Sequence, residues 1–393
     1  MSIVNRLGIS HLLSAALCLA LLCLAAPRPA QAQTYTVLHS FTGGVDGAYP
    51  HQIIQGSDGN FYGTATWGGA NGYGDIFEIS PSGVFNVLYS FAGGADGCQP
   101  EGPVFRDTNG DIYGTTHECG DPKCRCGVIF KLDTNNILTV LHTFTRATET
   151  EGVFPSNNLV SVKGELYGVT ESGVLYKITK TGHYTVVHEF NWLYPPGTQS
   201  ALIRDSAGNI YGDTYYSIYK LDTAGNFSVL YTFTDGVNDG ADPAGRLILS
   251  SSGTITGASQ YTPDPNRCGL VFRLEADGTL KALHHFEPGT SGCAPATGLI
   301  DMNGTIYGTT TEGGDEACLT SYQPHSCGVL YQISKTGVYT VVHSWNGADG
   351  ASPQDELTKG NDGNVYGITK SGGIYTGYCV DSDGCGVIFR YTP

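Results

Sequence analysis

Ionisable and aromatic side chains gather at one recurring position in this chain, in and directly after a short motif of the form Tyr-Gly-x-Thr. The ionisable candidates for acid or base chemistry are His117, Glu118, Glu171, Asp213 and Glu312. The candidates for ligand contact are Trp67, Tyr215, Tyr216, Tyr261 and Lys370. Carboxylates and imidazoles transfer protons, and flat rings stack on sugars. This mixture is typical of a glycan-binding cleft, a polysaccharide lyase or a glycoside hydrolase.

A plainer interpretation competes with each of these candidates. Glu and Lys at the start of a loop are commonly solvated surface groups. The sequence also holds no Gly-x-Ser-x-Gly elbow, no phosphate-binding loop and no His-Glu-x-x-His helix. The chain therefore offers candidate residues without a catalytic motif, and whether it is an enzyme stays open.

The motif that organises these residues occurs seven times. Its first position falls at residues 62, 113, 167, 211, 256, 307 and 366, spaced 44 to 59 residues apart, and only the fifth copy has threonine in place of tyrosine. A period of this length indicates a tandem array of supersecondary units. Each unit has four short apolar segments separated by Gly-rich turns, such as 103–106, 111–116, 127–132 and 138–144. Their length and alternation predict β-strands.

The order of segments at the two ends of the chain predicts how the array closes. The first segment after the leader, residues 37–41, is of the fourth type, and the last, residues 387–391, is of the third type. A ring of seven four-stranded blades, in which the N-terminal strand completes the last blade, uses each segment once and leaves no open edge. We therefore predict an all-β, seven-bladed β-propeller. A linear β-solenoid is the alternative, but it leaves the permuted ends unexplained.

The N-terminal 32 residues have the pattern of a secretory signal peptide. Arg6 precedes an apolar run over residues 12–26, which is too short to span a membrane, and Ala30-Gln31-Ala32 matches a signal-peptidase site. We expect cleavage after Ala32 and a single propeller domain over residues 33–393, secreted or periplasmic and without a transmembrane segment. With 36 acidic and 20 basic residues, the chain is a poor partner for nucleic acid. We expect a monomer.

Loop lengths distinguish the two faces of the predicted ring. Links between first and second strands, and between third and fourth, are tight turns, whereas the other two links are longer and varied. The long links emerge on one face, here called the loop face, where a ligand site is expected. The ten cysteines beyond the leader lie in or beside those long links, as expected of disulfides in an exported protein. We expect the pairs Cys318–Cys327, Cys379–Cys385 and Cys268–Cys293, and leave the pairing of Cys98, Cys119, Cys124 and Cys126 open.

Three further patterns suggest metal sites, but none of them has the features of a metal-binding motif. A column of histidines in the fourth segments alternates with Tyr89 and Tyr231, which favours packing against the next blade over metal binding. Several Asp-Gly pairs lack the alternating acidic series of a calcium loop. A zinc site within residues 119–126 lacks paired Cys-x-x-Cys spacing. We expect no metal and no cofactor.

The repeated Tyr-Gly-Thr, Gly-x-Val-Phe-Lys-Leu and Thr-Val-Leu-His-Ser-Phe segments, with Asp-Gly-Ala-x-Pro opening the next unit, resemble the bacterial tandem-repeat family called GloVer. The resemblance covers residues 34–393 and implies an exported repeat protein without an assigned activity. Members often end in an anchoring signal, whereas this chain ends at Pro393 without one, so free secretion or periplasmic residence is expected. The resulting hypothesis is an exported module that binds a glycan or a protein at the loop face. The alternatives are a lyase or hydrolase at that face and a structural role in the envelope.

Overall fold

The computed structural model describes residues 33–146, 150–190, 201–236, 238–295, 297–315, 318, 327–375, 379 and 383–393, apart from the side chains of residues 156 and 157. The expected signal peptide lies outside the described residues. Within them, no helix is long and apolar enough to cross a membrane.

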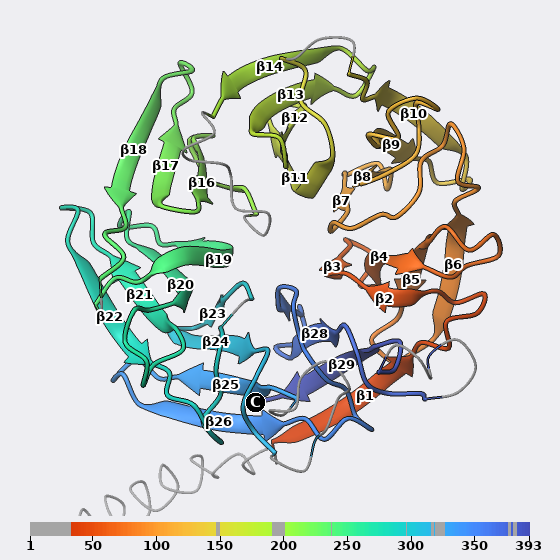
Figure 1. Ribbon diagram of the computed structural model, residues 1–393. Helices are drawn as coiled ribbons and strands as arrows, with labels where there is room; N and C mark the ends of the chain where they lie inside the picture. The colour runs from red at the N-terminus through yellow and green to blue at the C-terminus, as the bar shows by residue number, and fades with distance from the viewer. Residues whose placement is uncertain are drawn as a thin grey trace, which may run out of the picture.

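Seven antiparallel sheets, here called blades 1 to 7, are arranged in a ring around a central opening (Figure 1). Blade 1 has β2 (Ala48–Pro50), β3 (Ile54–Gln55), β4 (Phe61–Trp67), β5 (Asp75–Ile79) and β6 (Phe85–Ser90). Blade 2 has β7 (Phe105–Arg106), β8 (Ile112–Thr116), β9 (Val128–Leu132) and β10 (Leu138–Thr143). Blade 3 has β11 (Pro155–Val162), β12 (Glu165–Thr170), β13 (Val174–Thr179) and β14 (Tyr184–Glu189).

The remaining blades follow the same order from the centre outwards. Blade 4 has β15 (Ile203–Arg204), β16 (Ile210–Thr214), β17 (Ser217–Leu221) and β18 (Phe227–Thr232). Blade 5 has β19 (Ala241–Leu249), β20 (Ile255–Tyr261), β21 (Leu270–Leu274) and β22 (Leu280–His285). Blade 6 has β23 (Ile300–Met302), β24 (Thr305–Thr310), β25 (Val329–Ile333) and β26 (Tyr339–Ser344). Blade 7 has β27 (Thr358–Lys359), β28 (Val365–Thr369), β29 (Val387–Thr392) and, from the other end of the chain, β1 (Thr34–Ser40).

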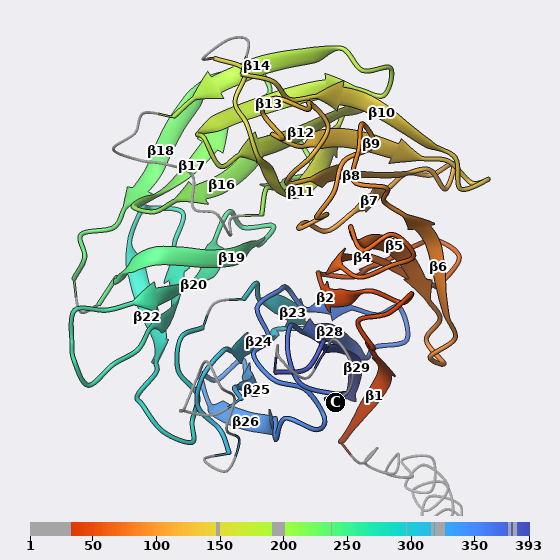
Figure 2. The same ribbon diagram turned by 45° about the vertical axis from the view of Figure 1, so that its right-hand side comes forward.

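The ring closes by strand exchange, as the permuted segments predict. β1 runs antiparallel to β29, with Thr34 opposite Thr392 and Ser40 opposite Val387. The first and last strands of the structure lie side by side in both ribbon views (Figures 1 and 2). The predicted seven-bladed propeller is therefore confirmed, and the linear solenoid is wrong.

The glycine of the Tyr-Gly motif is required by close packing inside each blade. A Cβ atom added to Gly114 would lie 2.5 Å from the Phe130 ring, and one added to Gly257 would lie 2.6 Å from Phe272 and 2.7 Å from Leu247. Contacts below 3 Å are repulsive, so only glycine fits between the aromatic residue of the third strand and the aliphatic residue of the first. The recurrent motif thus reports the packing of the fold.

The histidine column packs against the neighbouring blade, as expected. His39 stacks on Phe85 of blade 1 with ring centroids 4.0 Å apart, and His142 stacks on Tyr184 of blade 3 at 4.2 Å. His39 Nε2 also lies 3.2 Å from Asp46 Oδ2, which accepts hydrogen bonds from the Thr42 backbone. Among the described residues, no group of three or more His, Cys, Asp or Glu side chains could hold a metal ion.

Five disulfides join the ten cysteines beyond residue 32. The three expected pairs, Cys268–Cys293, Cys318–Cys327 and Cys379–Cys385, are present. The four cysteines whose pairing was open form Cys98–Cys119 and Cys124–Cys126. Every bridge lies on the loop face, where it constrains the long links between strands.

Candidate ligand-binding site

Two of the ionisable candidates are brought together across a blade boundary. His117 follows β8 in blade 2, Glu171 follows β12 in blade 3, and His117 Nε2 lies 3.2 Å from Glu171 Oε2. The imidazole also stacks on Phe154, with centroids 5.1 Å apart. Burial disfavours its charged form, but the hydrogen bond to Glu171 and the nearby charges of Glu101 and Glu118 outweigh burial, so the pKa of His117 is raised. The pair can hold and exchange a proton at the loop face.

The other candidates on this face are dispersed. Glu118 forms an ion pair with Arg125 at 3.0 Å. The Glu312 backbone pairs with Cys293, and the Lys370 backbone donates to Ser352. Trp67 is half-buried and packs against the hydrophobic core of blades 1 and 7, so it offers little ring surface to a ligand. Of these four, Glu118 lies near enough for its charge to raise the pKa of His117.

Asp213 does not reach the open face. Its side chain is 1% exposed in β16, and neither carboxylate oxygen has a hydrogen-bond partner in the described part of the chain. Burial, followed by the charge of Asp242, raises the pKa of Asp213 well above its ordinary value, which favours the protonated form. At the equivalent position of blade 1, Thr64 donates a hydrogen bond to Gly102 of blade 2 at 2.9 Å. Asp213 replaces a threonine that joins blades, and solvent cannot deliver a substrate to it directly.

Three of the aromatic candidates form an exposed cluster, here called the tyrosine cluster. Tyr215 and Tyr216 lie in the turn between β16 and β17 and are 38% and 36% exposed, and Tyr261 ends β20 of the next blade and is 49% exposed. The rings of Tyr215 and Tyr216 are 4.6 Å apart at 73°. The Asp242 backbone N–H donates a hydrogen bond to Tyr215 O at 3.1 Å. Burial raises the pKa of Tyr215, and the charges of Asp242 and Asp235 and the neighbouring Tyr216 and Tyr261 raise it further. The cluster thus combines flat rings with two carboxylates.

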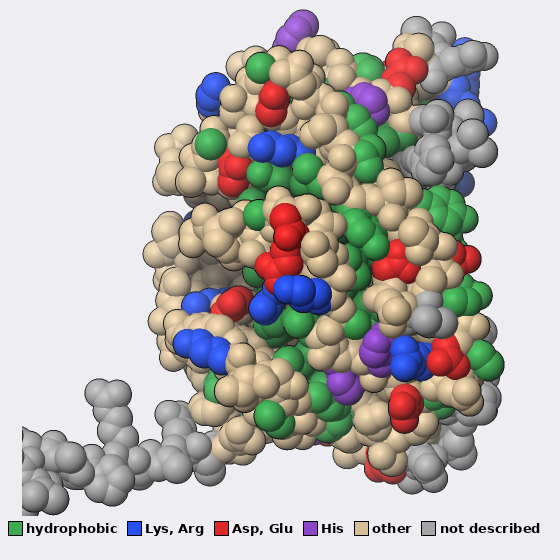
Figure 3. All heavy atoms as spheres, turned by 90° about the vertical axis from the view of Figure 1, so that its left-hand side faces the viewer, with side chains coloured by type: hydrophobic (Ala, Val, Ile, Leu, Met, Phe, Trp, Pro, Cys, Tyr) green, Lys and Arg blue, Asp and Glu red, His purple; other side chains and the backbone are tan. Residues whose placement is uncertain are grey.

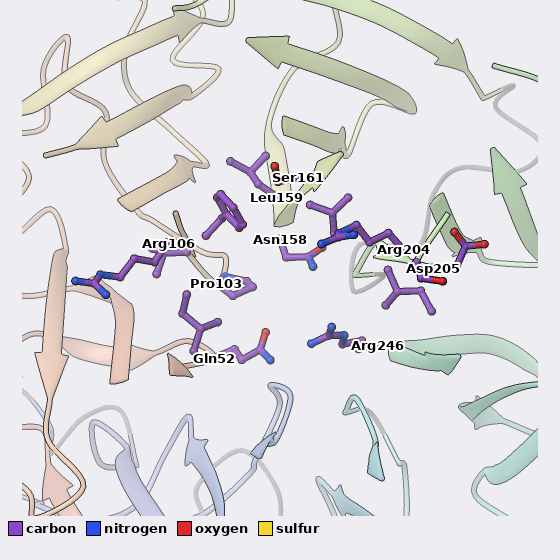
Figure 4. A pocket seen from close by; sticks show the side chains of 15 residues that line it. Gln52, Pro103, Arg106, Asn158, Leu159, Ser161, Arg204, Asp205 and Arg246 are labelled. Atoms are coloured by element: carbon purple, nitrogen blue, oxygen red, sulfur yellow. The ribbon is translucent and has the colours of Figure 1, made fainter. Parts of the chain in front are cut away.

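A cavity of about 540 Å³ occupies the central channel between the innermost strands. Blades 1 to 5 line it, and Figure 4 shows Gln52, Arg204 and Arg246 pointing into the open centre while Arg106 points away. Asn158, also at the wall, bridges blades 3 and 4, because its amide donates to Leu202 O at 2.9 Å and accepts from Leu202 N at 2.8 Å. A volume of this size accommodates a small molecule.

Sequence reasoning missed the channel residues. The candidate residues all lie in or directly after Tyr-Gly-x-Thr, whereas Arg246 lies in the first strand of its blade. Blades 4 and 6 have Ala201 and Gly298 at the matching position. The same position holds uncharged residues in five other blades and an acid, Glu356, in blade 7. A single basic residue at this register position is the signal that could have identified Arg246.

The outer side of the ring differs from the tyrosine cluster and from the central channel. Figure 3, which shows the side that carries blades 4 and 5, has acidic and basic side chains scattered among hydrophobic ones without a gathered basic patch on that side. Together, the fold, the channel and the loop face define a seven-bladed β-propeller with room for a ligand along its axis.

The sequence matches the Gloeobacter/Verrucomicrobia repeat family over residues 28–218 and 171–380, and the chain belongs to that family. This confirms the family resemblance expected from the repeated segments. A comparison with curated proteins finds no match.

Solved structures share the propeller fold at low sequence identity. The extracellular domain of a proposed one component system from B. thetaiotaomicron has a TM-score of 0.57 at 13% identity, covering 92% of this chain and 42% of that one. The extracellular domain of a proposed hybrid two component system from the same organism has a TM-score of 0.57 at 10% identity, with 92% and 41% covered. This chain therefore spans about two fifths of those domains. An oligogalacturonate lyase from Vibrio parahaemolyticus has a TM-score of 0.54 at 11% identity, covering 92% of this chain and 94% of that one.

Proposed function

We propose that the chain is an exported binding module that recognises a glycan at its loop face. The observation that carries this proposal is the tyrosine cluster, because Tyr215, Tyr216 and Tyr261 expose 36% to 49% of their surface at one place on two adjacent blades. Aromatic rings left partly in water stabilise a protein little, whereas they gain contact area when a sugar ring covers them. Asp235 and Asp242 nearby supply acceptors for sugar hydroxyls.

The comparisons support this proposal without deciding it. The neighbours from B. thetaiotaomicron are extracellular domains, consistent with export through the expected signal peptide and residence outside the cytoplasm. The neighbour from Vibrio parahaemolyticus is named for a sugar polymer, so the fold accepts such ligands in another protein. N-terminal sequencing of the exported protein tests the export step and is expected to begin at Gln33.

The binding proposal is tested by a glycan-array screen of the purified mature chain. We expect at least one glycan to bind, and we expect Tyr261→Ala to abolish most of the signal. Tyr73→Ala is the matched control, because Tyr73 is 39% exposed on blade 1, away from the tyrosine cluster. Binding that survives Tyr261→Ala but is lost in Tyr73→Ala would move the site to blade 1, and absence of any glycan binding would favour a protein ligand.

A second candidate function rests on the His117–Glu171 pair. An imidazole with a raised pKa beside a carboxylate can act as a general acid, so a polysaccharide lyase or glycoside hydrolase is the alternative. Mass spectrometry of every bound glycan after incubation separates the two functions. Cleaved product that disappears in both His117→Gln and Glu171→Gln would establish the enzyme, whereas intact glycan in all samples would establish the binding module.

A further inference from the structure

Two arginines in the central channel form no ion pair with any residue that the structure describes. Arg204 and Arg246 are both exposed to the channel, and neither guanidinium has a hydrogen bond or ion pair with any residue that the structure describes. This is unexpected in a chain with 36 acidic and 20 basic residues. Other arginines follow the ordinary pattern, as Arg125 pairs with Glu118 at 3.0 Å and Arg267 with Asp264 at 3.4 Å.

The unpaired state of Arg204 follows from one substitution in the preceding blade. Arg106 and Arg204 hold the same register position, opposite Ile112 and Ile210 in their respective blades. Arg106 forms an ion pair with Asp58 of the preceding blade at 2.9 Å and covers the Tyr62 ring at 4.5 Å. Blade 3, which precedes Arg204, has Lys163 at the position of Asp58, four residues before its Tyr-Gly motif. Arg204 therefore lacks that partner and extends into the channel (Figure 4).

Arg246 reaches the same open space by a different route. The pairing of β19 with β20 is irregular between Ala244 and Ile248, and Arg246 lies within that bulge. A Cβ atom on Gly298 would lie 2.5 Å from the Glu356 side chain and 2.9 Å from Arg246 Cβ, so the missing side chain of blade 6 makes the room that both occupy. Glu356 attracts Arg246 electrostatically, but no ion pair joins them.

We propose that the central channel is a binding site for a small ligand that carries an oxyanion. A sugar acid, which carries a carboxylate, fits the size of the channel. Arg204 and Arg246 are its charged anchors, and Gln52 is a polar wall residue beside them. A guanidinium presents a planar fork of donors that matches a carboxylate, and such charged pairs are among the stronger hydrogen bonds in proteins. The cavity of about 540 Å³ holds a monosaccharide acid. This site is separate from the tyrosine cluster and does not depend on the proposed function there.

The test is calorimetric titration of the mature chain with glucuronate, with glucose as the neutral analogue of equal size. We expect glucuronate to bind and glucose to give no measurable heat. Arg204→Gln and Arg246→Gln should each weaken glucuronate binding about tenfold or more, since each removes a charged hydrogen bond. Arg125→Gln removes the same charge from the loop face and should leave the affinity unchanged. Arg204→Lys keeps the charge without the fork and should give an intermediate loss.

Competition with inorganic phosphate and sulfate tests whether the channel binds oxyanions in general or sugar acids in particular. Competition by either ion supports a general oxyanion site, and glucuronate binding that resists both supports a site for sugar acids. Equal binding of glucose and glucuronate, no binding of any of the three anions, or full affinity in both folded Gln variants would overturn the proposal. Tyr261→Ala should not change glucuronate binding, so failure of this proposal and failure of the glycan proposal are distinguishable.

Discussion

The ring of Tyr35 stacks on the imidazole of His343, with centroids 3.7 Å apart and planes 4° apart. The phenol hydroxyl of Tyr35 accepts a hydrogen bond from Trp345 Nε1 at 2.8 Å and donates one to Asp349 O at 2.8 Å. These contacts join β1 to blade 6, so one N-terminal residue seals the boundary between blades 6 and 7. The same stacking joins His39 to Phe85, where no closure is needed, so the closing strand uses the ordinary contact of the repeat.

Tyr35→Ala should destabilise the ring by roughly 3 kcal/mol, because it removes a packed aromatic ring and leaves the buried Trp345 donor unpaired. Tyr35→Phe keeps the stack but also leaves the Trp345 donor unpaired, so it should lose about 1 kcal/mol. Urea denaturation of both variants measures the difference. A Tyr35→Ala protein as stable as the wild type would show that closure does not depend on this contact.

Gly114→Ala should destabilise the chain by roughly 2 kcal/mol, because its Cβ would meet the Phe130 ring at 2.5 Å. Gly94→Ala is the matched control, since the nearest atom to its Cβ would be Asp96 Oδ1, at 4.0 Å. Thermal unfolding compares the two. Phe130→Leu should recover part of the loss in the Gly114→Ala background, and a lack of recovery would contradict packing as the reason for the motif.

The Glu356→Gln variant should become more stable than the wild type as the pH rises. Burial raises the pKa of Glu356 to about 7 from 4.5, partly offset by Arg246. A carboxyl with a raised pKa in the folded state loses stability as pH increases from the unfolded to the folded value, here between about 4.5 and 7, by up to roughly 3 kcal/mol. Unfolding measured at pH 4.5 and pH 8 should show similar stability at the lower pH and a gain for the variant at the higher one. A difference in unfolding free energy between variant and wild type that stays constant from pH 4.5 to pH 8 would contradict the raised pKa of Glu356.

The Cys268–Cys293 bridge joins the loop of blade 5 to the link before blade 6, across a sequence separation of 25. Because the bridge closes a long loop, its loss should destabilise the chain by roughly 3 kcal/mol. The Cys379–Cys385 bridge has a separation of 6 and should contribute roughly 2 kcal/mol. Thermal unfolding of the two double Cys→Ser variants tests this order. The reverse order would indicate that local strain, and not loop closure, sets the contribution.

Strand order and the role of the histidine column could be predicted from sequence because each recurs in most or all of the seven units. Ring closure could be predicted because the segments at residues 37–41 and 387–391 are permuted. Asp213 and Arg204 could not be placed in the same way. Whether Arg204 meets a counter-charge depends on the adjacent blade, as the contrast between Asp58 and Lys163 shows. The burial of Asp213 likewise cannot be read from its own repeat unit. A repeat pattern shows what the units share, and the individual site arises where two neighbouring units differ.

The most direct test of the central claim is the affinity of the mature chain and of the Tyr215→Ala, Tyr261→Ala double variant for the strongest glycan found on the array. The tyrosine cluster predicts a loss of ten- to hundredfold in affinity with unchanged thermal unfolding, because aromatic contact area is removed from the ligand and not from the core. An affinity within twofold of the wild type, in a folded double variant, would contradict glycan recognition at this face.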